Sequence, residues 1–137
     1  MCYSLSNNAI PYLIFKSNVH KAERQILFFA RQHPGETISS HLMESLLKSL
    51  CKNSKILEKF EVICVPMLNV DGVIYGNFRT NLAGYDINRQ WQNTDKWLNP
   101  EVHAMKKLLV KNPKIEFVLD LHGHSKKFNS FIYACKQ

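Results

Sequence analysis

Residues 25–36, QILFFARQHPGE, place a short apolar run directly before a Pro-Gly turn and the start of a helix. The run 25–31 has the length and flanking residues of a buried strand rather than of a helix. Pro34 and Gly35 end it. A helix is predicted from about Glu36 to Cys51, because apolar side chains recur there at helical spacing. They are Ile38, Leu42, Met43, Leu46, Leu47 and Leu50.

The rest of the chain alternates between strands and helices in the same way. The other predicted strands are 10–15, 60–66, 115–121 and 129–134. A second helix is predicted from Asn99, as N-cap, and Pro100 to about Val110. The stretch 68–98 shows no sustained period and is predicted to be a functional loop. This order predicts an α/β fold with a largely parallel sheet that is covered by helices on both faces.

The composition is that of a soluble globular domain spanning residues 1–137. The hydrophobic fraction is 45%, the charged fraction is 21% and the formal net charge is +7. The basic residues are scattered, which is typical of a solvated surface, although they could also attract acidic partners. No basic stripe interleaved with aromatics is present, so nucleic acid is not expected as a partner.

The cysteines and the apolar runs indicate the cellular compartment in which the protein is expected. The four cysteines are Cys2, Cys51, Cys64 and Cys135. They form no CxxC pair, and Cys64 is predicted to be a small core residue. We expect a reducing, cytoplasmic location. The sequence shows no secretory signal and no apolar run long enough to cross a membrane, so no membrane association is expected.

Three side chains are candidate ligands for one metal ion. His33 and Glu36 follow the strand 25–31, and His122 follows the strand 115–121. Neighbouring parallel strands bring their carboxyl ends to one edge of a sheet, where ligands collect. Two histidines and one glutamate leave a fourth tetrahedral position for water, the pattern of a catalytic zinc site. The same donors also suit other divalent ions.

Each of these residues also has a plainer interpretation. Glu36 could favour the helix N-terminus through the helix dipole. His122 could be an ordinary loop histidine. His124, two positions further along the chain, could compete with His122 for the metal.

The loop 68–98 holds candidates for substrate binding. Arginine forks bind carboxylates in a bidentate way, so Arg79 and Arg89, with Asn88, could hold a terminal carboxylate and polarise a carbonyl. Asp86 could accept the free ring N–H of a ligand histidine. The alternative is that both arginines are surface residues that tie down a loop.

Five segments occur together in one order, and their order resembles the zinc carboxypeptidase superfamily. They are HPGE at 33–36, PMLNVDGV at 66–73, GNFR at 76–79, DINRQW at 86–91 and DLHGHS at 120–125. The residues of these segments are similar to those of the cytosolic carboxypeptidase branch, the tubulin-deglutamylating type. The resemblance runs from about residue 24 to the end. It covers only the N-terminal part of that catalytic domain, so residues 1–137 are expected to form a partial domain.

The resemblance implies a fold and a set of roles. The fold would be a truncated carboxypeptidase-like three-layer α/β/α arrangement with a mixed sheet. One zinc ion would be bound by His33, Glu36 and His122, with Asp86 as the partner of His33. Arg79 would assist carbonyl polarisation. Asn88 and Arg89 would bind the C-terminal carboxylate, and the substrates would be acidic, glutamate-rich protein tails such as that of tubulin.

The sequence also departs from the family pattern. Val70 stands where the branch usually has proline. The family's general base, a glutamate, and its substrate-covering tyrosine lie well downstream of the third ligand, and no acidic residue follows His122 here. We therefore expect a fragment that is inactive alone and has an exposed sheet edge. The alternatives are a non-catalytic module that binds acidic C-terminal tails, or an α/β domain with coincidental motifs.

Overall fold

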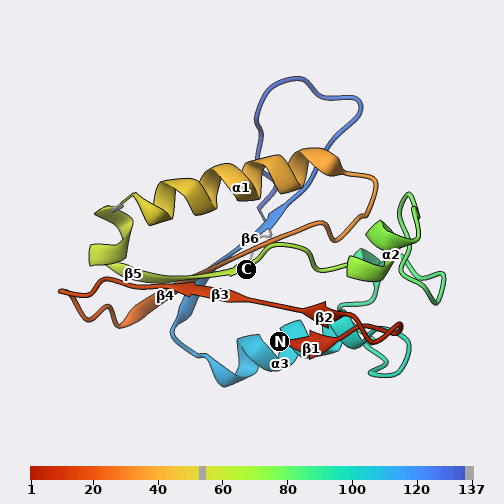
Figure 1. Ribbon diagram of the computed structural model, residues 1–137, viewed down its shortest axis with the longest axis horizontal. Coiled ribbons are helices and arrows are strands. Elements are labelled where there is room, and N and C mark those ends of the chain that lie inside the picture. Colours follow the sequence, from red (N-terminus) through yellow and green to blue (C-terminus); the bar gives the residue numbers. More distant parts are fainter. Residues whose placement is uncertain (53–54, 135–137) are drawn as a thin grey trace.

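The computed structural model describes residues 1–52 and 55–134, and its centre is one four-stranded sheet (Figure 1). The strands lie in the order β3 (Leu13–Phe15), β5 (Phe60–Val65), β4 (Arg24–Ala30) and β6 (Ile115–Leu121). Strands β5, β4 and β6 are parallel, and β3 pairs antiparallel with β5. The sheet is therefore mixed and largely parallel.

Helices cover both faces of this sheet, so the fold is the predicted three-layer α/β/α arrangement (Figure 1). Helix α1 (Thr37–Cys51) buries Met43 and Leu50 against Val62 and Cys64 of β5. Helix α3 (Pro100–Lys111) lies on the other face, where its apolar side chains share a second core cluster with β4 and β5. That second cluster includes Leu27, Phe29, Ile63, Val102 and Met105. The prediction that Cys64 is a core residue is confirmed.

The predicted strand 10–15 was wrong as a single element. The chain forms β2 (Ala9–Ile10), which pairs with β1 (Cys2–Tyr3) in a separate two-stranded sheet, and then β3 in the central sheet. Pro11 lies between the two pieces, and proline cannot donate to a strand ladder. The β1–β2 connection is anchored by Asp71, whose carboxylate accepts hydrogen bonds from Ser4, Ser6 and Asn8.

The sequence predicted an irregular loop over 68–98, but parts of this stretch are helical. It contains the short helix α2 (Val70–Ile74) and the 3-10 helix η2 (Ile87–Arg89). A further 3-10 helix, η1 (Lys55–Glu58), precedes β5. The side chain of Asn69 caps α2 by accepting a hydrogen bond from the backbone N–H of Gly72. These elements are too short to show a helical period in the sequence.

The end of the chain departs from the prediction of a strand at 129–134, which was wrong. Among the described residues, no strand pairs with the outer side of β6, so β6 forms an edge of the sheet, as expected. Its apolar residues Phe117, Val118 and Leu119 are 51%, 48% and 37% exposed. None of the described helices is long and apolar enough to span a membrane.

Candidate metal centre

The first two candidate ligands lie in a braced turn after β4. Arg31, at the end of the strand, has a φ of 55°, and its guanidinium donates to the carbonyl of Pro34. The backbone N–H of Gly35 donates to the carbonyl of Phe78 at 2.8 Å. A Cβ at Gly35 would lie 2.8 Å from that same oxygen, so only glycine fits here. The turn that carries His33 and Glu36 is thereby fastened to the loop that carries Arg79.

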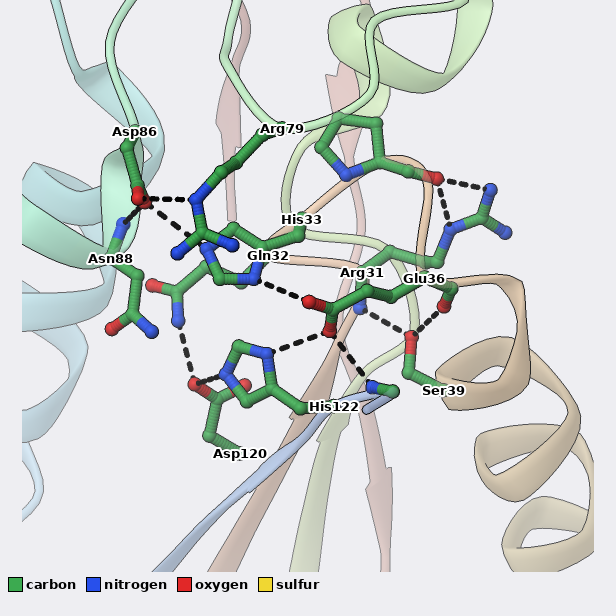
Figure 2. A network of polar contacts seen from close by, with 12 residues as sticks. Arg31, Gln32, His33, Glu36, Ser39, Arg79, Asp86, Asn88, Asp120 and His122 are labelled. Carbon is green, nitrogen blue, oxygen red and sulfur yellow. Dashed lines mark hydrogen bonds and ion pairs between the residues drawn. The ribbon is translucent and has the colours of Figure 1, made fainter. Parts of the chain in front are cut away.

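The three predicted metal ligands converge at the carboxyl ends of β4 and β6 (Figure 2). The Glu36 carboxylate lies between the two imidazoles, with Oε1 2.8 Å from Nδ1 of His33 and Oε2 2.8 Å from Nδ1 of His122. Their possible ligand atoms all lie within 4.8 Å of one another. Glu36 occupies the N-cap position of α1 but makes no capping hydrogen bond with its side chain. Its carboxylate serves the cluster instead.

The competing histidine points elsewhere. His124 is exposed, and its Nδ1 accepts from the backbone N–H groups of Lys126 and Lys127. Its ring packs edge-on against Phe131. Of the two histidines, His122 is the one that faces the cluster.

Hydrogen bonds set the charge of the cluster. Partial burial opposes the charged form of Glu36, but hydrogen bonds from His122, His33 and the N–H of Gly123 outweigh it and hold the pKa of Glu36 well below its usual range. Burial likewise opposes protonation of His122, but its bonds to Asp120 and Glu36 raise its pKa to about 9. These hydrogen bonds make the site an ionic cluster in which a carboxylate lies between nitrogen donors.

Asp86 contacts the far nitrogen of the His33 ring. Its Oδ1 lies 3.1 Å from Nε2 of His33, and its Oδ2 accepts from Nε of Arg79 at 2.7 Å. Its side chain also caps η2 by accepting the backbone N–H of Asn88 at 3.0 Å. Burial raises the pKa of Asp86, but the bonds from Arg79 and His33 outweigh that effect and lower it. Asp86 thus links an imidazole of the cluster to the guanidinium of Arg79.

The three candidate substrate-binding residues differ in how they are held. The side chain of Arg79 is 43% exposed and lies beside His33, and it is tied to the site through Asp86 (Figure 2). Asn88 joins the network through its backbone. Arg89 is exposed, and its guanidinium has no hydrogen-bond partner among residues 1–52 and 55–134. The structure therefore connects Arg79 to the cluster but leaves Arg89 outside the network.

Sequence reasoning missed Asp120 and Gln32. The Asp120 carboxylate contacts Nε2 of His122 and accepts a hydrogen bond from the Gln32 amide at 2.6 Å. Asp120 precedes His122 by two positions, and residues at that spacing share one face of an extended chain. That alternation was the available signal for Asp120. Gln32 carried no comparable signal.

The profile of the zinc carboxypeptidase family matches residues 1–137. The chain belongs to this family. Its curated relatives include cytosolic carboxypeptidases. It is 40% identical to cytosolic carboxypeptidase 6 of Caenorhabditis elegans over 82% of this chain and 27% of that one. It is 38% identical to mouse cytosolic carboxypeptidase 1 over 98% of this chain and 13% of that one.

Solved carboxypeptidases share the fold of this zinc carboxypeptidase chain. A metallo-carboxypeptidase from Pseudomonas aeruginosa superposes with a TM-score of 0.82 and 31% identity over 89% of this chain and 33% of that one. A carboxypeptidase A from Helicoverpa armigera superposes with a TM-score of 0.78 at 17% identity, which shows the fold alone. The chain spans 33% of the Pseudomonas protein, 39% of the Helicoverpa protein and 27% or less of the two curated relatives above.

The donor set fits the zinc that the family implies. Zinc accepts imidazole nitrogen and carboxylate oxygen, and three protein ligands leave a fourth position open. The two Nδ1 atoms already face one carboxylate, and each ring has an aspartate at its other nitrogen. Such outer carboxylates orient ligand histidines in metalloproteins. The residues present therefore suit a metal of this kind.

Proposed function

We propose that this chain carries the metal-binding and carboxylate-binding part of a zinc carboxypeptidase that removes C-terminal glutamates from acidic protein tails, such as that of tubulin. The observation that carries the proposal is the convergence of His33, Glu36 and His122 on one point at the edge of the sheet. Membership of the zinc carboxypeptidase family supports the reaction class.

In this proposal, His33, Glu36 and His122 hold one zinc ion. Bound zinc polarises the scissile carbonyl and acidifies its water. Asp86 keeps the ring of His33 in place by accepting its Nε2 proton, so that Nδ1 is free for the metal. Glu36 can serve as a ligand at neutral pH because its hydrogen bonds keep it ionised.

The loop after α2 would bind the peptide terminus. Arg79 uses Nε to hold Asp86, which leaves the two Nη groups of its fork for a carbonyl or carboxylate oxygen of the substrate. Asn88 and Arg89, at the adjacent 3-10 helix, would receive the C-terminal carboxylate. An exposed guanidinium that has no partner among the described residues suits that task, because carboxylate binding is then not opposed by an existing ion pair.

Acidic substrates agree with the net charge of the chain, and a cytosolic location agrees with the names of its relatives. The chain has a net charge of +7, which favours acidic peptides through long-range attraction. The two curated relatives compared above carry the name cytosolic carboxypeptidase. We propose acidic C-terminal tails as partners rather than nucleic acid or a membrane surface.

A chain of these 137 residues should bind but not turn over. Residues 123–137 contain no acidic side chain, so the glutamate that the family resemblance implies as general base does not lie among them. Loss of a general base costs about 10²–10⁴ in rate even when the fold is intact. The second candidate function, a non-catalytic module for acidic tails, is favoured by this same feature.

One experiment tests the proposed binding and the proposed lack of turnover together. The chain is mixed with zinc and a glutamate-tailed peptide, and both peptide binding and glutamate release are measured. We expect binding that requires a free C-terminal carboxylate and is lost when the peptide is C-terminally amidated. Equal binding of both peptides would contradict the proposal. Zinc-dependent release of glutamate would overturn the binding-only function and the claim that these residues alone are inactive.

A further inference from the structure

The two imidazoles of the cluster have matching surroundings. In each ring, Nδ1 faces the carboxylate of Glu36 and Nε2 faces an aspartate. For His33 the aspartate is Asp86, which lies on the loop after α2. For His122 it is Asp120, which lies on β6 itself, two positions earlier. The proposed function above gives Asp86 a task at His33 but none to Asp120 at His122.

We propose that Asp120 is the positioning residue of His122 and that Gln32 and Trp91 fix its direction. Asp120 accepts the Nε2 proton of His122, which turns Nδ1 toward Glu36 and leaves its lone pair for the metal. The inference rests on the proposed metal site. It adds a support that couples that site to the substrate-binding loop.

The donors and acceptors along this path allow one arrangement. The indole N–H of Trp91 can only donate, and it lies 2.7 Å from Oε1 of Gln32. The amide of Gln32, which is 1% exposed, must therefore present its NH₂ group to Asp120, 2.6 Å away. An ionised carboxylate can only accept, so His122 must donate from Nε2. Each hydrogen bond thus sets the orientation of the next group, from the indole of Trp91 to the imidazole of His122.

Packing holds both ends of this path. Trp91 packs its ring against Phe29 of β4, with centroids 5.8 Å apart. In the parallel pairing of β4 with β6, Phe29 lies opposite Asp120. Figure 2 shows the Gln32 amide reaching down to the Asp120 carboxylate beside the ring of His122. Trp91 follows Asp86 by five positions, so one loop braces both imidazoles, His33 through Asp86 and His122 through Trp91 and Gln32.

The alternative is that Asp120 only secures the packing of Gln32 and Trp91. Three substitutions separate positioning from packing. Asp120→Ala removes the acceptor of His122. Asp120→Asn keeps an acceptor oxygen in a side chain of similar shape, so it should retain most of the zinc affinity. Trp91→Phe keeps an aromatic ring against Phe29 but removes the donor that fixes Gln32. Glu116→Gln is the matched control, because Glu116 also lies on β6 but pairs with Arg24, at the surface.

The first measurement is zinc affinity of the full 137-residue chain by competition with a chelator. We expect Asp120→Ala to weaken zinc binding by about 10–100-fold, the usual effect of losing an outer partner of a ligand histidine. Trp91→Phe should weaken it less, Asp120→Asn should retain most of it, and Glu116→Gln should leave it unchanged. If Asp120→Ala does not fold, Trp91→Phe decides: unaltered zinc affinity in that variant overturns the proposal.

The second measurement needs no metal. The Nε2 proton of His122 should give a downfield resonance protected from exchange in the metal-free wild type, and Asp120→Ala should lose it. A chain that binds no zinc but shows this resonance would refute the proposed function and keep the inference. A chain that binds zinc equally with and without Asp120, or that lacks the resonance, would overturn the inference and leave the proposed function standing.

Discussion

The carboxylate of Glu36 lies 2.8 Å from Nδ1 of His122, although 86 positions separate the two residues in the chain. Strands β4 and β6 are parallel neighbours, so the turn after one and the turn after the other meet at the same edge of the sheet. Gly123 allows this approach, because its backbone N–H also donates to Glu36 and a Cβ there would lie 3.3 Å from Cβ of Glu36. The long-range contact is what turns separate motifs into one site.

Replacing the shared carboxylate should abolish most metal binding. Glu36→Gln should weaken zinc binding by at least about 10-fold, since it removes one of three donors and the charge between two imidazoles. Glu44→Gln is the control, because Glu44 lies on the same helix and pairs only with Lys48 at the surface. Chelator competition measures both variants. Equal affinity in Glu36→Gln and Glu44→Gln would show that Glu36 is no ligand.

Adding one methyl group at Gly35 should loosen the turn. The new Cβ would lie 2.7 Å from a ring carbon of Phe78 and 2.8 Å from its backbone oxygen, and the oxygen cannot move without shifting the loop. We expect Gly35→Ala to lower the free energy of unfolding by about 1–3 kcal/mol, as overpacking usually does. Urea denaturation measures the change. A variant as stable as the wild type would mean that the turn and the loop are not held together.

Buried Glu101 should make stability depend on pH. Burial, with the nearby charge of Asp71, raises its pKa from 4.5 to about 7. The folded state therefore holds this proton more tightly than the unfolded state, so stability is fully present below pH 4.5 and falls as pH rises through about 7. The shift corresponds to a loss of about 3 kcal/mol.

The isosteric substitution Glu101→Gln tests this dependence. It keeps the shape of the side chain and cannot ionise, so it should reduce the fall in stability between pH 4.5 and 8 and stabilise the chain at pH 8 relative to the wild type. Denaturation midpoints across this range measure the effect. A wild-type profile that rises with pH over the same range would contradict the assignment.

The open edge at β6 should make the isolated chain self-associate. The register places Leu119 beside Phe28 and Val118 beside Leu27, so exposed apolar side chains lie on both faces of this edge strand. Such edges promote aggregation, and a charge on the strand opposes it. Val118→Lys should shift the chain toward monomer in sedimentation experiments. Val110→Lys, at a more exposed position on α3, should leave the association state unchanged. An equal effect of both substitutions would show that β6 is not the edge through which the chain associates.

Local sequence patterns predicted most of the fold because they reflect local physics. The strands β4, β5 and β6 and the helices α1 and α3 follow their apolar periods to within one or two residues. Asn99 does precede α3, but its side chain makes no capping bond and instead accepts from Asn81. One failure is non-local. A strand at 129–134 would need a partner, and none is present among the described residues.

The site was predictable where one residue type demands one chemistry. Histidine and glutamate at strand ends pointed to a metal, and the structure brings those three side chains together. The choice of His122 over His124 and the isolation of Arg89 could not be read from spacing, because both depend on how a loop turns. The role of Gln32 could not be predicted from the sequence, because only the folded structure shows that its amide contacts Asp120 and Trp91.

Titration of the metal-free chain with zinc tests the central claim most directly. The account predicts one ion per chain in the wild type, and a loss of binding in His33→Ala and in His122→Ala. His124→Ala, two positions along the chain, should bind zinc as the wild type does. Binding that survives the first two substitutions, or that disappears only with His124→Ala, would contradict the account.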